Sequence, residues 1–334
     1  YEMLRSLVGS EMCIRDRDIR TYNYKTEPYE HQLETLARSA HKNLFALFLE
    51  MGLGKSKILL DNTAMLFEQG EISGLLIVSP KGNLRNWDVH EISKHLPDRI
   101  ERNVLVWQPN HTQQWTKDYE RMVKEDSEGA LNIFLVNVEA FATPRACKFV
   151  EEFLVTHDAM MAIDESTTIK NPKAKRTKHL IKLAPLADYR RILTGFPITK
   201  APLDLYSQCY FLSPNLLGFS SFYAFQARYA ITQNKHMGRH SFQQIVGFQK
   251  LEELQESIKD FSIRKIKDEC LDLPPKVYTR RCVELTDEQK KAVVSHLQEF
   301  VVDPKIKIER EKQARREDMT LEEVEKEEEI VIAD

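Results

Sequence analysis

The chain has 334 residues, of which 42% are hydrophobic and 30% are charged, and its formal net charge is −3. This length has room for about two domains, and the composition is that of a globular protein rather than a disordered or fibrous one. The slightly negative charge gives no overall reason to expect nucleic-acid binding, so any such binding must depend on local basic patches.

The cysteines and the apolar runs restrict the class of protein further. The five cysteines, at positions 13, 147, 209, 270 and 282, form no C-x-x-C pair. Their scatter argues against a zinc site or a disulfide framework and favours a reducing compartment. No apolar run approaches the roughly 18 residues that a membrane span needs. We therefore expect a cytoplasmic protein with no membrane partner.

The first residues differ from the rest of the chain. The sequence begins at Tyr1, without a methionine, and residues 6–17 (SLVGSEMCIRDR) look like a translated sequencing adapter. We expect residues 1–17 to be non-native, and the chain to be a fragment of a longer protein.

A helix is predicted over residues 28–41, because Tyr29, Leu33, Leu36 and Ala40 recur at helical spacing. Gln32 falls in its first turn. A glutamine can read the edge of an adenine, since its amide both donates and accepts hydrogen bonds. Taken alone, however, Gln32 is better explained as a solvated surface residue.

Residues 43–56 (NLFALFLEMGLGKS) have the pattern of a phosphate-binding loop: a strand at 44–49, two loop glycines, and a helix over 58–67. Glycines allow backbone N–H groups to turn toward a phosphate. Lys55 would then reach the β- and γ-phosphates of ATP, and the Ser56 hydroxyl would ligate Mg²⁺. The strict pattern has another glycine where Leu49 stands. An ordinary strand-to-helix turn with a solvated lysine is therefore the alternative.

Further apolar runs predict the sheet. Residues 74–79 (GLLIVS) are continuously apolar, which suits an inner parallel strand, and strands are also predicted at 103–107 and 132–136. The loop after residue 79 should lie at the same sheet edge as the phosphate loop. This alternation of strands and helices predicts a doubly wound α/β fold, with a mostly parallel sheet covered by helices on both faces.

Residues 159–165 (AMMAIDE) form an apolar strand that ends in two carboxylates. In a nucleoside triphosphatase, Asp164 would hold Mg²⁺ and Glu165 would orient the attacking water. A helix-capping Asp-Glu pair is the structural alternative. The phosphate loop upstream favours the catalytic interpretation.

A basic segment follows directly. Residues 166–183 contain no acidic residue and six basic ones: Lys170, Lys173, Lys175, Arg176, Lys178 and Lys182. Such a patch suits contacts with DNA phosphates. A solvated helix face explains the same charges about equally well.

The remainder changes in character. A strand at 189–195 and a helix over 203–211 complete the first domain, and residues 213–273 are predicted to be a helical annex without sheet. Residues 274–334 are predicted to hold a linker, a strand at 276–285, a helix that begins near Thr286, and a charged tail.

Taken together, six ordered segments resemble the Snf-type, chromatin-remodeller-like ATPases of superfamily-two helicases, and in character the phage and bacterial members. The segments are EPYEHQ (27–32), EMGLGKS (50–56), LLIVSPKGNLRNW (75–87), IDESTTIKN (163–171), ILTGFPITKAPLDLY (192–206) and IRKIKDECLDLPPK (263–276). The resemblance covers about residues 20–300, and it places the protein in a bacterial or phage-infected cell.

The resemblance implies a two-lobed RecA-like motor that uses ATP and Mg²⁺ and moves on duplex DNA. Residues 18–212 would be the first lobe, 213–273 its helical protrusion, and 274–334 the linker and truncated start of the second lobe. The implied catalytic residues are Lys55, Asp164 and Glu165, with Ser56 and Asp164 at the metal. The implied nucleotide contacts are Gln32, Met51, Gly52, Leu53, Gly54, Lys55 and Ser56, and the implied DNA path includes Ser79, Pro80, Lys81, Lys170, Thr194 and Gly195.

Several positions depart from the family pattern. Leu49 replaces an aspartate, Ser56 a threonine, Phe196 a threonine and Lys200 an asparagine, and Ser166-Thr167 replace Ala-His. The arginines that a second lobe would direct at the γ-phosphate are not in the chain, and such arginines are worth about 10³-fold or more in rate. We therefore expect weak or no hydrolysis from this fragment.

Two other functions are compatible with the sequence. One is a strand-separating RNA or DNA helicase of another superfamily-two branch, against which the helical annex and the DLPPK segment speak. The other is a nucleotide-binding module without turnover, which the missing second lobe would favour for the fragment.

Overall fold

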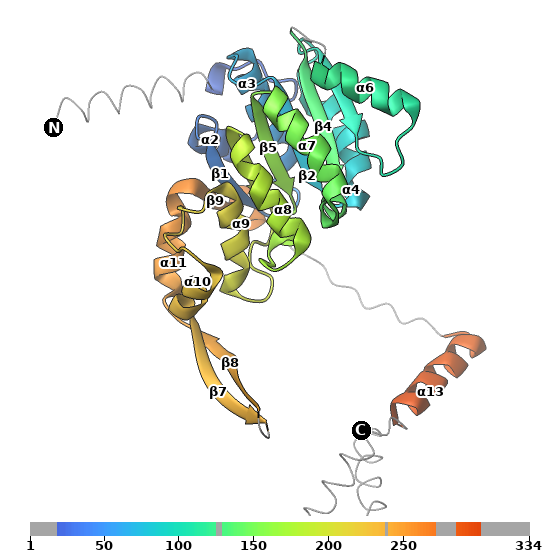
Figure 1. Ribbon diagram of the computed structural model, residues 1–334, viewed down its shortest axis with the longest axis vertical. Coiled ribbons are helices and arrows are strands. Elements are labelled where there is room, and N and C mark those ends of the chain that lie inside the picture. Colours follow the sequence, from blue (N-terminus) through green and yellow to red (C-terminus); the bar gives the residue numbers. More distant parts are fainter. Residues whose placement is uncertain (1–18, 125–128, 238–239, 272–284, 302–334) are drawn as a thin grey trace, which may run out of the picture. The chain divides into compact units, whose positions relative to one another are not determined.

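The computed structural model describes residues 19–124, 129–237, 240–271 and 285–301 (Figure 1). The chain divides into two units, residues 1–273 and 274–334, which are described separately. The predicted non-native segment 1–17, the strand predicted at 276–285 (all but its last residue) and the charged tail lie outside the described residues.

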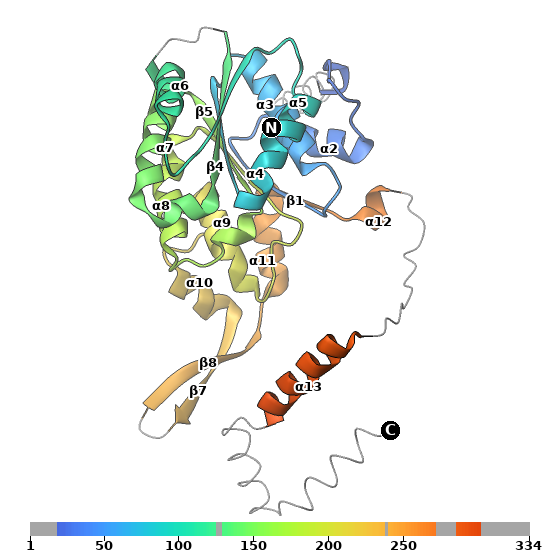
Figure 2. The ribbon, with the colours of Figure 1, turned by 90° about the vertical axis from the view of Figure 1, so that its right-hand side faces the viewer.

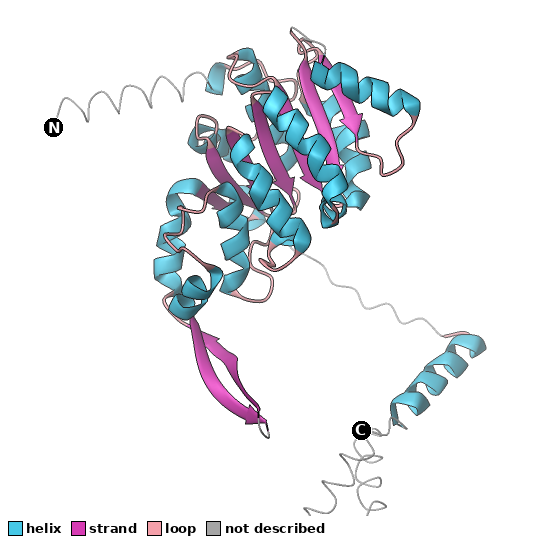
Figure 3. Cartoon of the chain, viewed as in Figure 1, coloured by secondary structure: helices cyan, strands magenta, loops and turns pink. Residues whose placement is uncertain are grey.

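A seven-stranded sheet forms the centre of the first unit, with the strand order β3-β4-β2-β5-β6-β1-β9 (Figure 3). All of its strand pairs are parallel. The strands are β1 (Leu44–Leu49), β2 (Gly74–Ser79), β3 (Arg102–Val106), β4 (Leu131–Asn137), β5 (Ala159–Asp164), β6 (Tyr189–Leu193) and β9 (Ser262–Lys265). The predicted parallel α/β sheet is confirmed.

The inner strands are continuously apolar because both faces of the sheet are covered. In β2, Leu75 and Ile77 pack into one hydrophobic core, whereas Leu76 and Val78 pack into the other. Successive side chains of a strand point to opposite faces, so a strand between two cores carries apolar residues at every position.

Helices cover each face, as Figure 2 shows. One core receives α2 (Glu30–Ser39), α3 (Lys55–Glu68), α4 (Lys81–Asn86) and α5 (Ile92–His95). The opposite core receives α6 (Gln113–Lys124), α7 (Pro144–Thr156), α8 (Lys175–Leu183) and α9 (Leu205–Leu212). Between α4 and α5 the helix has π-type hydrogen bonding at Trp87–Glu91, a feature frequent at functional sites.

The prediction that residues 213–273 are a helical annex without sheet is wrong in two places. Helices α10 (Phe222–Tyr229), α11 (Leu251–Ile258) and α12 (Lys267–Cys270) are present, but β7 (Ala230–Met237) and β8 (His240–Phe248) form an antiparallel hairpin. In addition, β9 joins the main sheet beside β1. The hairpin lacks the alternation of apolar and polar residues that marks a half-buried strand, and the short β9 is defined by its distant partner.

The second unit contains the described helix α13 (Asp287–Val301). Thr286 Oγ1 accepts a hydrogen bond from the Gln289 N–H, and Gln289 Oε1 accepts one from the Thr286 N–H. This reciprocal pair is a capping box, and it confirms the helix start predicted near Thr286.

Candidate nucleotide-binding and catalytic site

The predicted phosphate loop lies between the end of β1 at Leu49 and the start of α3 at Lys55. Gly52 and Gly54 have φ values of 86° and 81°, in the left-handed region that residues with a side chain rarely adopt. A Cβ atom on Gly54 would lie only 2.2 Å from Gln32 Nε2. The two glycines therefore allow the tight turn into α3, where unpaired backbone N–H groups favour an anion.

Gln32 lies directly against this loop and is almost fully buried. Its Nε2 donates to the Leu53 carbonyl oxygen at 3.2 Å, and its Oε1 accepts from the Tyr29 N–H at 3.0 Å. A primary amide has a second N–H and a second lone pair, so these contacts leave Gln32 with capacity to read an adenine. That role remains a prediction.

Lys55 lies between the phosphate loop and the acidic pair. Its ammonium donates to the Leu49 carbonyl oxygen at 3.0 Å. Burial lowers the pKa of Lys55, while the nearby carboxylates of Glu165 and Asp164 act in the opposite direction. The fold thus brings together two sequence segments about a hundred residues apart, as a nucleotide site of this type requires.

Asp164 is held by three donors on one oxygen. Its Oδ2 accepts from Ser79 Oγ at 3.0 Å, Asn83 Nδ2 at 2.6 Å and Trp87 Nε1 at 2.9 Å. Its Oδ1 accepts the Glu165 N–H at 3.0 Å. These bonds fix the orientation of the carboxylate at the end of β5.

Glu165 has a left-handed backbone, with φ 49° and ψ 60°, which is uncommon for a residue other than glycine. Its Oε2 accepts from Thr194 Oγ1 at 3.3 Å. Its pKa is raised chiefly by burial and also by Asp164, whereas Lys55 and Thr194 lower it. A half-buried carboxylate with a raised pKa beside a cation has the properties of a proton acceptor that positions water.

The oxygen donors of the site suit a hard cation. Mg²⁺ prefers oxygen ligands, and the Ser56 hydroxyl and the Asp164 carboxylate are of that kind. Asp164 Oδ1 accepts a single N–H within the described residues, which leaves it lone-pair capacity. The residues therefore fit Mg²⁺ bound together with a nucleotide. In the described ranges, this site included, no group of three or more His, Cys, Asp or Glu side chains could hold a metal.

Trp87→Phe is expected to weaken Mg²⁺-dependent nucleotide binding by about 10-fold, because a hydrogen bond to a charged group is worth about 1.5–3 kcal/mol. Phenylalanine lacks the indole N–H and is smaller than tryptophan, so the variant also leaves a cavity at this fully buried position, and the control must carry the same loss of volume. Titration of Mg²⁺ at a fixed concentration of a labelled ATP analogue measures the effect. The matched control is Trp107→Phe, which replaces a buried tryptophan directly after β3. An equal shift in both variants would show that Trp87 acts only through packing.

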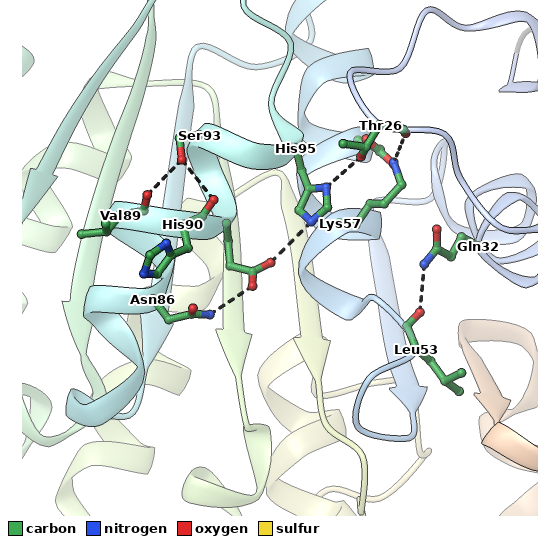
Figure 4. A network of polar contacts seen from close by, with 11 residues as sticks. Thr26, Gln32, Leu53, Lys57, Asn86, Val89, His90, Ser93 and His95 are labelled. Atoms are coloured by element: carbon green, nitrogen blue, oxygen red, sulfur yellow. Dashed lines mark hydrogen bonds and ion pairs between the residues drawn. The ribbon is translucent and has the colours of Figure 1, made fainter. Parts of the chain in front are cut away.

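A polar network links α3 with the helical segment that runs from α4 to α5 (Figure 4). Thr26 links two helices: its hydroxyl bonds His95 Nδ1 at 2.8 Å, and its carbonyl oxygen accepts from Lys57 Nζ at 2.6 Å. Lys57 also pairs with Asp61 at 2.8 Å inside α3. Burial lowers the pKa of His95 to about 4 and raises that of Asp61 to about 6. These contacts connect α3, which starts at the phosphate loop, to the helix that carries Trp87.

The residues predicted along the DNA path occupy different surroundings. Ser79 and Thr194 are buried, and their hydroxyls donate to Asp164 and Glu165 respectively. Gly195 packs against the phosphate loop, since a Cβ there would lie 3.4 Å from the Met51 nitrogen. Lys170 forms an ion pair with Asp204 at 3.5 Å. Pro80 is partly buried and Lys81 is exposed at the start of α4. As DNA contacts, all six remain predictions.

Four residues at the site were not predicted. Asn83 and Trp87 hold Asp164, although both lie within the LLIVSPKGNLRNW segment. The Lys267 ammonium lies beside Gly52, since a Cβ atom added to that glycine would be 3.6 Å from Lys267 Nζ. Arg264 donates to the Gly195 carbonyl oxygen at 2.6 Å. Only the segment resemblance could have indicated these residues, because their contacts join distant parts of the chain.

Comparison with known proteins gives a consistent result. The model of the SNF2-related domain matches residues 31–331. Chromatin remodeling factor mit1 of Schizosaccharomyces pombe is 24% identical over 242 residues, which are 72% of this chain and 15% of mit1. The Sulfolobus solfataricus SWI2/SNF2 ATPase core domain is 25% identical with a TM-score of 0.56, covering 84% of this chain and 53% of that one.

The same archaeal ATPase core solved in complex with dsDNA is 24% identical, with a TM-score of 0.53, and the match covers 74% of this chain and 46% of that chain. The chain therefore spans about half of the solved core. Its fold is the RecA-like α/β fold of SNF2 ATPase cores. Within the described residues, no helix is long and apolar enough to cross a membrane.

Proposed function

The chain belongs to the family of SNF2-related domains, and from this premise we propose that it is the ATP-binding lobe of a DNA-dependent ATPase that moves along duplex DNA. The observation that carries the proposal is the grouping of Lys55, Asp164 and Glu165 at one edge of the sheet. A second RecA-like lobe would complete the motor.

Each of these side chains has a defined task in the proposal. Lys55 binds the β- and γ-phosphates, and Ser56 and Asp164 hold Mg²⁺. Glu165 accepts a hydrogen bond from the attacking water and orients it, and Thr194 keeps the Glu165 carboxylate in place. Bound Mg²⁺ would neutralise charge that develops on the phosphates.

The buried hydroxyls suggest how DNA could affect hydrolysis. Thr194 and Ser79 hold Glu165 and Asp164, while the exposed Lys81 follows Ser79 by two residues. A DNA phosphate that contacts the loops after β2 and β6 would therefore move the groups that hold the acidic pair. The complex of the archaeal ATPase core with dsDNA supports duplex DNA as the ligand.

ATP hydrolysis by the full-length protein tests this function. We expect duplex DNA to stimulate hydrolysis more strongly than single-stranded DNA or RNA, with no separation of the strands in a displacement assay. Absence of stimulation by duplex DNA would contradict the proposal. Strand displacement at the rate of hydrolysis would favour a strand-separating helicase.

Charge reversal of the basic segment is expected to weaken duplex binding for all sequences. Lys175 and Arg176 are the first residues of α8, and Lys173 precedes it by two residues; α8 follows β5 and hence begins near the sheet edge of the acidic pair. Phosphate contacts release counterions, so the binding constant falls as the salt concentration rises. Each lost contact should lower the slope of log binding constant against log salt concentration by about one. The Lys173→Glu, Lys175→Glu, Arg176→Glu variant is titrated with fluorescent duplexes at two salt concentrations.

The control for this experiment keeps the change in net charge and moves its position. Lys117, Lys178 and Lys182 are exposed, and the last two lie on the same helix, farther along it. If the triple variant at 173–176 loses at least about 10-fold more affinity than this control, the start of α8 faces the DNA. Equal losses would mean a solvated helix face and leave the loops at 79–81 and 194–195 as the contacts.

A further inference from the structure

The β7–β8 hairpin extends away from the parallel sheet as a two-stranded ribbon (Figures 1 and 2). Side chains at 231–235 and 243–246 are exposed, and because successive side chains alternate, both faces of the ribbon meet solvent. A two-stranded ribbon alone is marginally stable, and its unpaired edges invite aggregation. A ribbon with marginal stability and exposed edges is explained if its exposed faces bind a ligand.

The base of the ribbon is anchored, which gives it a defined direction. Tyr229 and Ala230 are buried, and Phe248 packs against the same hydrophobic core. The Gln249 N–H donates to the Tyr229 carbonyl oxygen at 2.9 Å, and Gln249 Nε2 donates to the Arg228 carbonyl oxygen at 3.1 Å. The ribbon is thus attached to the rest of the first unit through packed residues and hydrogen bonds.

The chemistry of the ribbon suits a polyanion with hydrogen-bonding edges. Residues 205–251 contain no aspartate or glutamate, although the whole chain has 51. Two adjacent cross-strand pairs consist only of amides, Gln233 with Gln244 and Asn234 with Gln243. Adjacent pairs face opposite sides, so each face presents two amides, and Lys235 adds a positive charge. Amides can donate to phosphates and base edges and also accept from bases.

We propose that the β7–β8 ribbon binds duplex DNA, with an amide-bearing face in a groove and Lys235 beside the phosphate backbone. The major groove of B-DNA admits a two-stranded β-ribbon. This inference rests on the proposed function, because it requires that duplex DNA is the ligand along which the ATPase moves. The ribbon would then be a contact with DNA additional to the loops at the sheet edge.

The test compares two double variants of the full chain with the same change in net charge. Gln233→Glu with Lys235→Glu alters the ribbon, and Gln113→Glu with Lys117→Glu alters exposed residues of α6. Fluorescent duplexes are titrated at two salt concentrations. We expect the ribbon variant to bind about 10-fold or more weakly, with a salt slope lower by about one, and the α6 variant to bind within about 3-fold of the parent.

Thermal melting and binding of a labelled ATP analogue should be unchanged in both variants, since the replaced side chains are exposed. Equal affinities of parent and ribbon variant, or equal losses in both variants, would overturn the role of the ribbon alone. No duplex binding by the parent would overturn the proposed function together with it. Sedimentation could also show that the parent and the α6 variant are dimers and that the ribbon variant is a monomer with unchanged affinity for DNA. In that case the ribbon pairs with a second copy of the chain, and the DNA proposal fails.

Discussion

Lys55→Ala is expected to abolish detectable ATP binding, with a loss of affinity of about 100-fold or more. The physical reason is that Lys55 is the one cation of the phosphate loop itself, and hydrogen bonds to charged groups contribute about 1.5–3 kcal/mol each. Equilibrium binding of a labelled ATP analogue in the presence of Mg²⁺ measures the effect.

The fold should tolerate this substitution. Burial already disfavours the Lys55 ammonium, as its lowered pKa shows, so removal of the charge is not expected to lower the melting temperature much. Lys178→Ala, at an exposed position of α8, is the control and should bind like the parent. If Lys55→Ala binds the analogue as tightly as the parent, the phosphate loop is misassigned.

Glu165→Gln in the full-length protein is expected to retain ATP binding and to reduce hydrolysis by about 10²-fold or more, the range for loss of a positioned proton acceptor. The amide oxygen can still accept the bond from Thr194, so the local structure should persist. Steady-state hydrolysis with saturating duplex DNA measures the effect. Glu139→Gln, an exposed glutamate after β4, controls for the loss of a carboxylate, and unchanged turnover in Glu165→Gln would exclude the assigned role.

The pH dependence gives a second readout of Glu165. Burial and the neighbouring Asp164 raise its pKa, so the carboxylate becomes protonated at a higher pH than an ordinary glutamate. Hydrolysis requires the ionised form and should therefore decline on acidification sooner than the usual glutamate pKa would predict. The residual activity of Glu165→Gln should lack this decline.

Features that depend on contiguous residues could be read from the sequence. The phosphate loop is a single segment in which apolar residues, glycines and Lys55 follow in order, and the structure places it between β1 and α3 as predicted. The inner strands were predictable because both of their faces are buried, which makes each strand an unbroken apolar run. The acidic pair was identified for the same reason, since it ends such a run.

The surroundings of the acidic pair could not be read in this way. Ser79, Asn83 and Trp87 lie 85, 81 and 77 residues from Asp164, whose Oδ2 they share. The resemblance places Ser79 on a DNA path, whereas the fold buries its hydroxyl against Asp164. No local pattern specifies such a contact, because it depends on β2 and β5 being neighbours in the sheet.

The sequence by itself determined the strands with two buried faces, the phosphate loop and the acidic strand end, because burial and backbone chemistry act there on neighbouring residues. Only the tertiary structure decided that β9 pairs with β1 and that β7 and β8 form a ribbon. The four residues of β9 gain their hydrogen bonds from a strand more than 200 residues away in sequence. The ribbon is stabilised by its own cross-strand bonds and its buried base, and exposure of both faces removes the apolar period by which a strand is recognised.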